Sequence, residues 1–273
     1  MSERDGYEPG VPCWVDTWQP DPEKAVSFYT QLFGWEAEDT MPPDSPGHYF
    51  VCKLRSREVA AVGSDRGGGA PSVPAWGTYI WVESADDTVA KVTGAGGSVL
   101  IQPFDLLEVA ARVAVLSDPA GAVFGVWQPG EHRGARLVNE PEAWAMSQLN
   151  TRDLEGAKAF YGAVFGWTTQ EFGEDGIALW RLPGYEGGEP GQPVSREVVA
   201  TMAPMGERFP ADLAPHWSVN FWVADTDAIA EKSAELGGKV VVSPHDTPGF
   251  RDAVLADPQG AVFSVSQLIA GGP

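Results

Sequence analysis

Histidine is the residue type that most often serves metal centres and acid–base catalysis, and this chain contains four: His48, His132, His216 and His245. A divalent metal needs about three or four nitrogen, oxygen or sulfur ligands that converge on one point. His216 is the best placed of the four, but no histidine or cysteine partner for it is evident. We therefore expect His216 to be a polar residue at a strand start and predict no metal there.

Motifs for nucleophilic catalysis and phosphate binding are missing from the sequence. There is no Gly-x-Ser-x-Gly elbow, and neither Cys13 nor Cys52 is set beside a histidine that could activate it. The glycine run at residues 67–69 lacks the Lys-Ser/Thr pair of a phosphate loop, so no nucleotide site is predicted. Both cysteines fall in expected strands, where a buried, reduced thiol is the ordinary role and a disulfide is disfavoured.

Composition and charge exclude several classes of partner. The 273 residues include 18 Lys+Arg against 38 Asp+Glu, a net charge of −20 that repels nucleic acid and anionic membranes. The sequence shows neither an apolar stretch of membrane-spanning length nor a secretory signal, so we expect a cytoplasmic protein. The 11 tryptophans are numerous enough to line a pocket for a flat organic ligand as well as a core.

The chain repeats itself at about half its length. The string FYTQLFGW at residues 28–35 returns as FYGAVFGW at 160–167, and DPAGAVFGVWQ from Asp118 returns as DPQGAVFSVSQ from Asp257. These landmarks occur in the same order in both halves. This pattern indicates a tandem duplication.

Strand and helix signals alternate in the same order within each half. In the first half a strand over about 13–18 precedes a helix with Asp21 as its N-cap, Pro22 in its first position and Gly34 at its end. Three strand-like runs follow, and after the loop at residues 66–74 the pattern restarts. A β-α-β-β-β unit therefore occurs four times, which favours an α+β fold with antiparallel pairing.

The Asp21 cap with its FYTQLFGW string and the Asp118-Pro119-x-Gly121 turn resemble the vicinal oxygen chelate superfamily. That superfamily contains glyoxalase I, extradiol dioxygenases, fosfomycin-modifying transferases and the bleomycin-resistance proteins. The resemblance covers nearly the whole chain and is closest to two-domain actinobacterial members that are often labelled hydroxylase. Its motifs are specific for the fold, whereas the same fold hosts metal enzymes, metal-free binders and accessory proteins.

The resemblance implies a tandem pair of glyoxalase-like domains. Each would consist of two βαβββ modules that close into a mixed sheet with one concave face, which we call its cup, around a pocket. We expect the first domain at residues 12–129 and the second at 144–268, joined by a linker at 130–143.

The resemblance also implies where a metal would bind, because metal-dependent members carry His or Glu on the first and last strands of each module. The matching residues are Trp14, Gly77 and Gly125 in the first half and Met146, Ser218 and Ser264 in the second. None of these side chains is a competent metal ligand. We therefore expect neither half to bind a metal and predict no cofactor.

Strand alternation from these positions indicates which side chains face the cups. Those expected in the first cup are mostly aromatic: Trp14, Asp16, Trp18, Tyr79, Trp81 and Trp127. Those expected to bind ligand in the second cup are mostly neutral and polar: Gln148, Asn150, Asn220 and Trp222. Asp16 beside Tyr79 forms a candidate catalytic pair, as base or hydrogen-bond partner. The alternative is that the rings only fill the core.

These features favour a metal-independent small-molecule-binding protein whose ligand is aromatic or polyketide-like, in secondary metabolism or resistance. Two alternatives stay open. One is an enzyme of the same superfamily, a glyoxalase-type lyase or isomerase or a hydroxylase or dioxygenase that uses Asp16, Tyr79 or a noncanonical metal site. The other is a non-catalytic protein that binds a partner. We expect a small-molecule ligand, no nucleic acid and no membrane, and a homodimer is compatible with the sequence.

Overall fold

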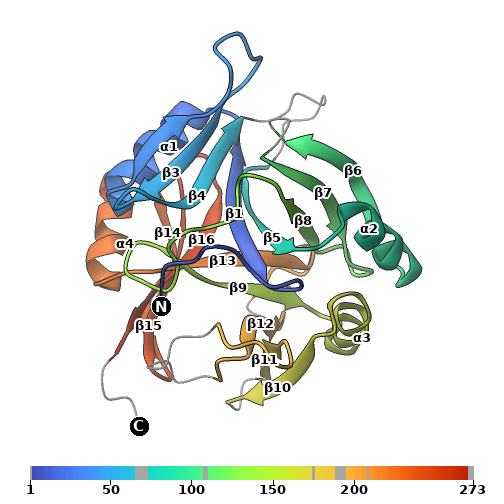
Figure 1. Cartoon of the computed structure of the whole chain (residues 1–273). Coiled ribbons are helices and arrows are strands. Elements are labelled where there is room, and N and C mark those ends of the chain that lie inside the picture. The colour runs from blue at the N-terminus through green and yellow to red at the C-terminus, as the bar shows by residue number, and fades with distance from the viewer. Residues whose placement is uncertain are drawn as a thin grey trace.

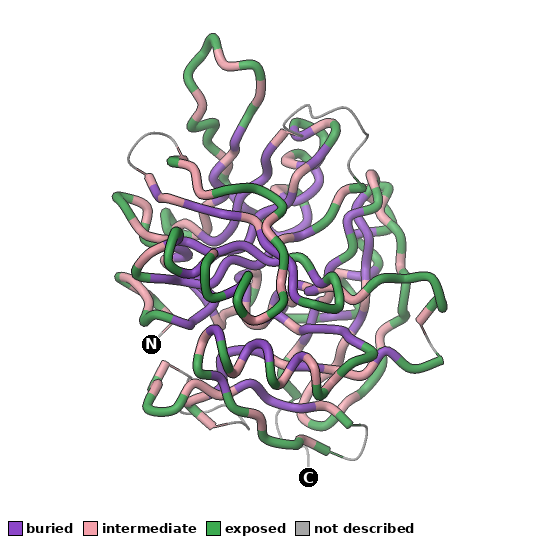
Figure 2. The backbone as a smooth tube through the Cα atoms, turned by 90° about the vertical axis from the view of Figure 1, so that its right-hand side faces the viewer, coloured by how far each residue is buried: buried purple, intermediate pink, exposed green. Residues whose placement is uncertain are grey.

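The computed structural model describes residues 2–64, 73–106, 110–173, 176–187, 195–207 and 209–269. The glycine run at residues 67–69 lies outside the described residues. Figure 1 shows the chain, and Figure 2 shows that its buried residues follow the central strands while exposed residues cover the outer loops and helix faces. In the described part of the chain, no helix combines the length and apolar character needed to cross a membrane.

The first half is an eight-stranded mixed sheet with two helices. Its elements are β1 (Pro12–Gln19), α1 (Pro22–Phe33), β2 (Glu36–Asp39), β3 (Tyr49–Leu54), β4 (Arg57–Ser64), β5 (Ala75–Trp81), α2 (Ala85–Gly94), β6 (Ser98–Leu106), β7 (Ala111–Ser117) and β8 (Val123–Pro129). The strand order is β2-β3-β4-β1-β5-β8-β7-β6. The two βαβββ modules therefore meet where β1 pairs antiparallel with β5.

The second half repeats this arrangement. Its elements are β9 (Trp144–Thr151), α3 (Leu154–Phe165), β10 (Thr168–Phe172), β11 (Ile177–Arg181), β12 (Val198–Pro204), β13 (His216–Trp222), α4 (Thr226–Glu235), β14 (Lys239–Thr247), β15 (Phe250–Ala256) and β16 (Val262–Leu268). The strand order, β10-β11-β12-β9-β13-β16-β15-β14, matches that of the first sheet position by position. The predicted α+β class, with two glyoxalase-like cupped sheets in tandem, is confirmed.

Helix α1 begins and ends at the residues that the sequence predicts. The Asp21 side chain accepts a hydrogen bond from the Lys24 backbone N–H, and Pro22 occupies the first turn, where no intrahelical donor is needed. Gly34 ends the helix at φ 71°, a left-handed conformation that glycine adopts without steric cost. This cap directs the chain back toward the sheet at the turn between α1 and β2.

The two halves are joined because helices of one half pack against the other half. Figure 1 shows α1 beside α4 and α2 beside α3. The Phe33 ring of α1 lies 5.1 Å from the Phe221 ring of β13, between centroids. Phe124 of β8 lies 6.1 Å from Phe160 of α3. The helix that Phe124 meets therefore belongs to the other half.

A buried Trp–Tyr–Asp chain of hydrogen bonds crosses the contact between the halves. The indole Nε1 of Trp76 donates to the Tyr29 hydroxyl at 2.9 Å, and this hydroxyl donates to Asp257 Oδ2 at 3.0 Å. The other carboxylate oxygen of Asp257 accepts from the backbone N–H groups of residues 259–261 and so holds its own turn. Burial raises the pKa of Tyr29 well above its ordinary value, so the phenol stays protonated and can donate.

The second contact mirrors the first. Trp217 Nε1 donates to the Tyr161 hydroxyl at 2.9 Å, and Tyr161 donates to Asp118 Oδ2 at 3.3 Å. In each hydrogen-bond chain the tyrosine comes from the FY…FGW string of one half. The aspartate comes from the DPxGAVF string of the other half. The repeated strings therefore form the two sides of the contacts between the halves.

The tryptophan of each FGW string adds a further bond across this interface. Trp35 Nε1 donates to the Glu142 carbonyl oxygen, just before β9, at 2.7 Å. Trp167 Nε1 donates to the Gly10 carbonyl oxygen, just before β1, at 2.8 Å. Each half thus fixes the entry of the other half's first strand.

The segment at residues 130–143 packs against the first half through part of its length. Ala135, Leu137 and Ala143 are buried, and the Ala135 backbone N–H donates to the Cys13 carbonyl oxygen at 2.8 Å. Glu3 of the N-terminal segment forms a β-bridge with Leu137. This segment connects the halves with its apolar residues in the core, and it brings Glu131 and His132 to the first cup.

We expect Tyr29→Phe and Tyr161→Phe each to lower the free energy of unfolding by about 1–3 kcal/mol, because each leaves a buried indole without its acceptor and removes a donor from a buried carboxylate. Chemical denaturation followed by circular dichroism measures this loss. The exposed Gln31→Ala on α1 is the control. Midpoints for both tyrosine variants equal to that of the control would contradict the proposed importance of the chains.

Candidate ligand-binding site

A cavity of about 330 Å³ lies against the first sheet and is lined in part by residues of β3, β4 and β8. It is the candidate ligand site of the first cup. Its volume falls in the range of small-molecule sites, which runs from roughly 300 to 1,000 Å³. The lining residues are Thr40, Tyr49, Val51, Glu58, Leu106, Ala110, Trp127, Glu131 and His132. Trp127 is the one residue of the predicted site among them.

A Trp–Tyr–Asp chain of the same kind lies beneath this cavity. Trp14 Nε1 donates to the Tyr49 hydroxyl at 3.0 Å, and Tyr49 donates to Asp16 Oδ2 at 3.1 Å. Trp14 and Asp16 have exposed fractions of 0% and 1%. Burial, and next the negative charge of Asp16, raise the pKa of Tyr49 well above its ordinary value. The hydroxyl of Tyr49 is thus engaged below, so its ring is what lines the cavity, with only 4% of the residue exposed.

The Tyr79 ring fills space next to two of the implied metal-ligand positions. A Cβ atom on Gly125 would overlap the Tyr79 ring, and one on Gly77 would lie 3.3 Å from Asp16 Oδ1. Tyr79 also packs edge-on against Trp127, with 5.7 Å between ring centroids. The packing of Tyr79 therefore requires glycine at position 125, whereas a side chain at position 77 would only crowd Asp16.

The side chains at these positions do not fit a metal ion. Gly77 and Gly125 offer no donor atom, and Trp14, the third position, uses its only polar atom to donate a hydrogen bond. Within the described ranges, no group of three or more His, Cys, Asp or Glu residues is arranged to hold a metal. No chemical step through a metal follows from these residues.

His132 belongs to the site although the sequence placed it in the linker. Its ring lies 4.4 Å from that of Trp14 and 5.1 Å from that of Trp127, between centroids. Burial lowers its pKa to about 4, so the imidazole is neutral near neutral pH. Nδ1 accepts from the Gly134 backbone N–H at 3.2 Å, which leaves the proton on Nε2. No spacing in the sequence signals this role, because the return of residues 130–143 creates it.

Two other predicted residues lie at the margin of the first cup. Trp18 packs against Tyr49 at 5.7 Å between ring centroids. Trp81 packs against Tyr7 of the N-terminal segment at 6.0 Å, and the Arg133 guanidinium lies 5.9 Å from its ring. Neither tryptophan lines the cavity. The structure thus brings together Trp14, Asp16, Tyr79 and Trp127 and sets Trp81 apart.

In the second cup the predicted amides bond to one another and to neighbouring hydroxyls. Gln148 Nε2 donates to Asn150 Oδ1 at 2.9 Å, while its Oε1 accepts from the Thr201 hydroxyl at 3.2 Å. Asn150 Nδ2 donates to the Ser218 hydroxyl at 3.1 Å, and His216 Nε2 lies 3.4 Å from the same nitrogen. These bonds order the polar surface without any ligand.

The other two predicted residues of the second cup are half-buried. Asn220 Nδ2 donates to the Ser266 hydroxyl at 2.7 Å. Trp222 packs against Phe250 at 6.4 Å between ring centroids. The second cup therefore carries a neutral, polar surface with one aromatic edge, in contrast to the aromatic and acidic first cup.

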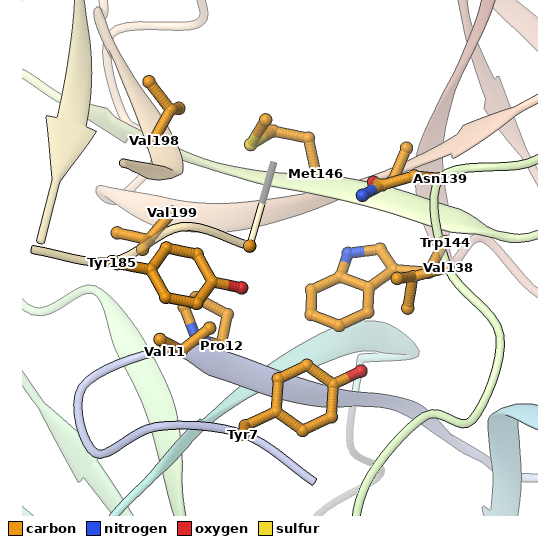
Figure 3. Close-up of a pocket in the computed structure, with 12 residues that line it drawn as sticks. Tyr7, Val11, Pro12, Val138, Asn139, Trp144, Met146, Tyr185, Val198 and Val199 are labelled. Carbon is orange, nitrogen blue, oxygen red and sulfur yellow. The ribbon is translucent and has the colours of Figure 1, made fainter. Parts of the chain in front are cut away.

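A smaller cavity of about 50 Å³ lies between the N-terminal segment and the second sheet (Figure 3). Met146, one of the implied metal positions, lines it together with Tyr7, Tyr185 and Trp144. Trp144 Nε1 is buried and has no hydrogen-bond partner among the described residues. The volume suits a few water molecules rather than an organic ligand, so the first cup is the stronger candidate.

The two halves match models of related domains. Residues 14–126 match the Glyoxalase/Bleomycin resistance protein/Dioxygenase superfamily, and residues 145–266 match the Glyoxalase-like domain. The Mn(II)-bound glyoxalase from Novosphingobium aromaticivorans has a similar fold, with a TM-score of 0.62 and 14% identity over 95% of this chain and 82% of that one.

Full-length relatives share more of the sequence. A Mycobacterium bovis protein named "Putative glyoxylase CFP32" is 39% identical over 268 residues, which cover 97% of each chain. The anthracycline biosynthesis protein DnrV of Streptomyces peucetius is 34% identical over 284 residues, which cover 98% of this chain and 96% of that protein. With two cupped sheets that each match the family, this chain belongs to the glyoxalase/bleomycin resistance protein/dioxygenase superfamily, also called vicinal oxygen chelate, as a tandem two-domain member.

Proposed function

We propose that this protein binds a flat aromatic, polyketide-like molecule in the first cup without a metal. The observation that carries the proposal is the 330 Å³ cavity with the rings of Tyr49 and Trp127 in its wall. Both rings are held in place, Tyr49 by the bonds beneath it and Trp127 by its donation to the His132 carbonyl oxygen at 3.1 Å. Rigid aromatic walls favour a planar ligand, because little side-chain entropy is lost on binding.

Binding without a metal is supported by the residues at the implied ligand positions. Family members that use a metal need side-chain donors where this chain has Trp14, Gly77 and Gly125. The ring of Tyr79 fills the space beside Gly125. A ligand would therefore be recognised by protein groups alone, through ring contacts and hydrogen bonds.

The chemical class of the ligand is suggested by the relatives. DnrV and DauV, which is 35% identical over 281 residues, are both named as anthracycline biosynthesis proteins. Anthracyclines are aromatic polyketides, and a ligand of that kind would contact the aromatic rings that line the first cup. A role in secondary metabolism or resistance follows from this proposal. Gln148, Asn150, Asn220 and Trp222 are proposed as a second, more polar ligand surface.

The hydrogen bond between Tyr49 and Asp16 favours one other function, that of a metal-free enzyme. Tyr49 lines the cavity and its hydroxyl donates a hydrogen bond to Asp16, so the pair could pass a proton between a ligand and the buried carboxylate. Tyr79 lies next to both. A lyase or oxygenase reaction of this kind would lose its turnover in Asp16→Asn while the fold stayed intact, as measured by product formation and circular dichroism.

We expect 1,8-dihydroxyanthraquinone to quench the tryptophan fluorescence of the protein in a saturable manner. Trp127→Phe should weaken this binding about three- to tenfold, because the smaller ring offers less contact area. Trp222→Phe, in the other cup, is the matched control and should bind as the wild type does. A flat titration would refute the aromatic ligand, and a loss confined to Trp222→Phe would move the site to the second cup.

Binding of the same probe should be unchanged after extensive dialysis against a chelator, because no metal ligand is available at the implied positions. Calorimetric titration before and after dialysis measures this, together with elemental mass spectrometry of the protein. Binding that disappears with the chelator and returns with added Mn²⁺, Fe²⁺, Ni²⁺ or Zn²⁺ would show that a metal is required after all.

A further inference from the structure

The carboxylate of Glu58 lines the first cup without a cation of its own. Two cations lie near enough to affect it, Lys53 and Arg136, and each is already paired. Lys53 Nζ lies 2.6 Å from Glu38 Oε2, and Arg136 Nη2 lies 2.6 Å from Asp5 Oδ1. Burial raises the pKa of Glu58, which reflects the cost of keeping this charge partly out of water.

The other ionisable groups of the lining leave this negative charge uncompensated. His132 Nε2 lies 3.7 Å from Glu58 Oε2, too far for a hydrogen bond, and the imidazole is neutral near neutral pH. Glu131 adds a second carboxylate, and neither lysine nor arginine is among the described lining residues. The wall of the cavity is therefore acidic as well as aromatic.

A cationic group is the kind of group that this acidic and aromatic lining binds best. A cation near Glu58 would offset the desolvation of that carboxylate with a charge-assisted hydrogen bond. The rings of Tyr49 and Trp127 also attract cations through their negative faces. The net charge of −20 for the whole chain raises the local concentration of cationic ligands and repels anionic ones.

We propose that the ligand of the first cup is an aromatic compound that carries a protonated amine, and that Glu58, assisted by Glu131, binds this charge. The inference rests on the proposed function, because it concerns the ligand of the same cavity. A neutral phenolic ligand is less favoured, since it could donate a hydrogen bond to Glu58 but would leave the negative charge without a counter-ion.

Two probes that differ only in charge test the proposal on the intact protein. 2-(Aminomethyl)anthraquinone is protonated near neutral pH, and 2-(hydroxymethyl)anthraquinone is its neutral counterpart. In calorimetric titrations at low salt we expect the amine to bind about tenfold or more tightly than the alcohol, a factor that corresponds to about 1.4 kcal/mol. Raising the ionic strength to about 0.5 M should reduce this preference and leave the affinity of the alcohol nearly unchanged.

Glu58→Gln should remove most of the preference for the amine while the alcohol binds within about twofold of the wild type. Glu131→Gln should remove a smaller part, and Glu23→Gln, an exposed site on α1, is the control with the same loss of charge. Equal affinity for the two probes, or an equal loss of affinity for both in Glu58→Gln, would overturn the inference. The proposal that the first cup binds an aromatic ligand would still stand. Failure of both probes to bind would overturn the proposed function and this inference with it.

Discussion

The fold depends on a buried hydrogen-bond chain that joins an indole, a phenol and a carboxylate across the two halves. A tyrosine of each half donates to an aspartate of the other, as Tyr29 does to Asp257. A phenol and a carboxylate in an apolar interface are costly unless each polar atom is paired. Once paired, they fix the position of one sheet against the other. The repeated strings in the sequence are therefore best understood as the two faces of an internal interface.

The same kind of chain recurs in the first cup, where it serves the site instead of the interface. Trp14 and Asp16 hold the hydroxyl of Tyr49, and the Tyr49 ring becomes a fixed wall. The Tyr79 ring fills the space next to Gly125 that a metal-ligating side chain at this position would need. Packing of aromatic rings thus replaces donor atoms at the centre of the cup. The site is suited to recognising shape and charge.

The asymmetry between the two cups follows from residues outside the repeat. The segment at residues 130–143 is unique in the chain, and it brings His132 and Glu131 to the first cavity only. Glu58 then faces a neutral imidazole instead of a cation. In the second cup, amides such as Gln148 are satisfied by neighbouring side chains. A duplicated fold has in this way acquired one charged, aromatic cavity and one neutral, polar surface.

The sequence alone determined the duplication, the four βαβββ modules, the family and the two ends of α1, because these depend on local residue types such as Asp21 and Gly34. It also predicted that Trp14, Asp16, Tyr79 and Trp127 share one face, since strand alternation is a local property. Which of these side chains reaches the cavity was decided by tertiary structure.

Trp14 and Asp16 are covered because Tyr49, from a different strand, lies over them. His132 and Glu58 enter the site because two segments separated by more than seventy residues of chain meet there. Their charge states depend on desolvation and on partners distant in sequence, such as Lys53 and Arg136. Local patterns encode which elements form, whereas burial and long-range pairing, which act only in the folded chain, decide what the cavity can bind.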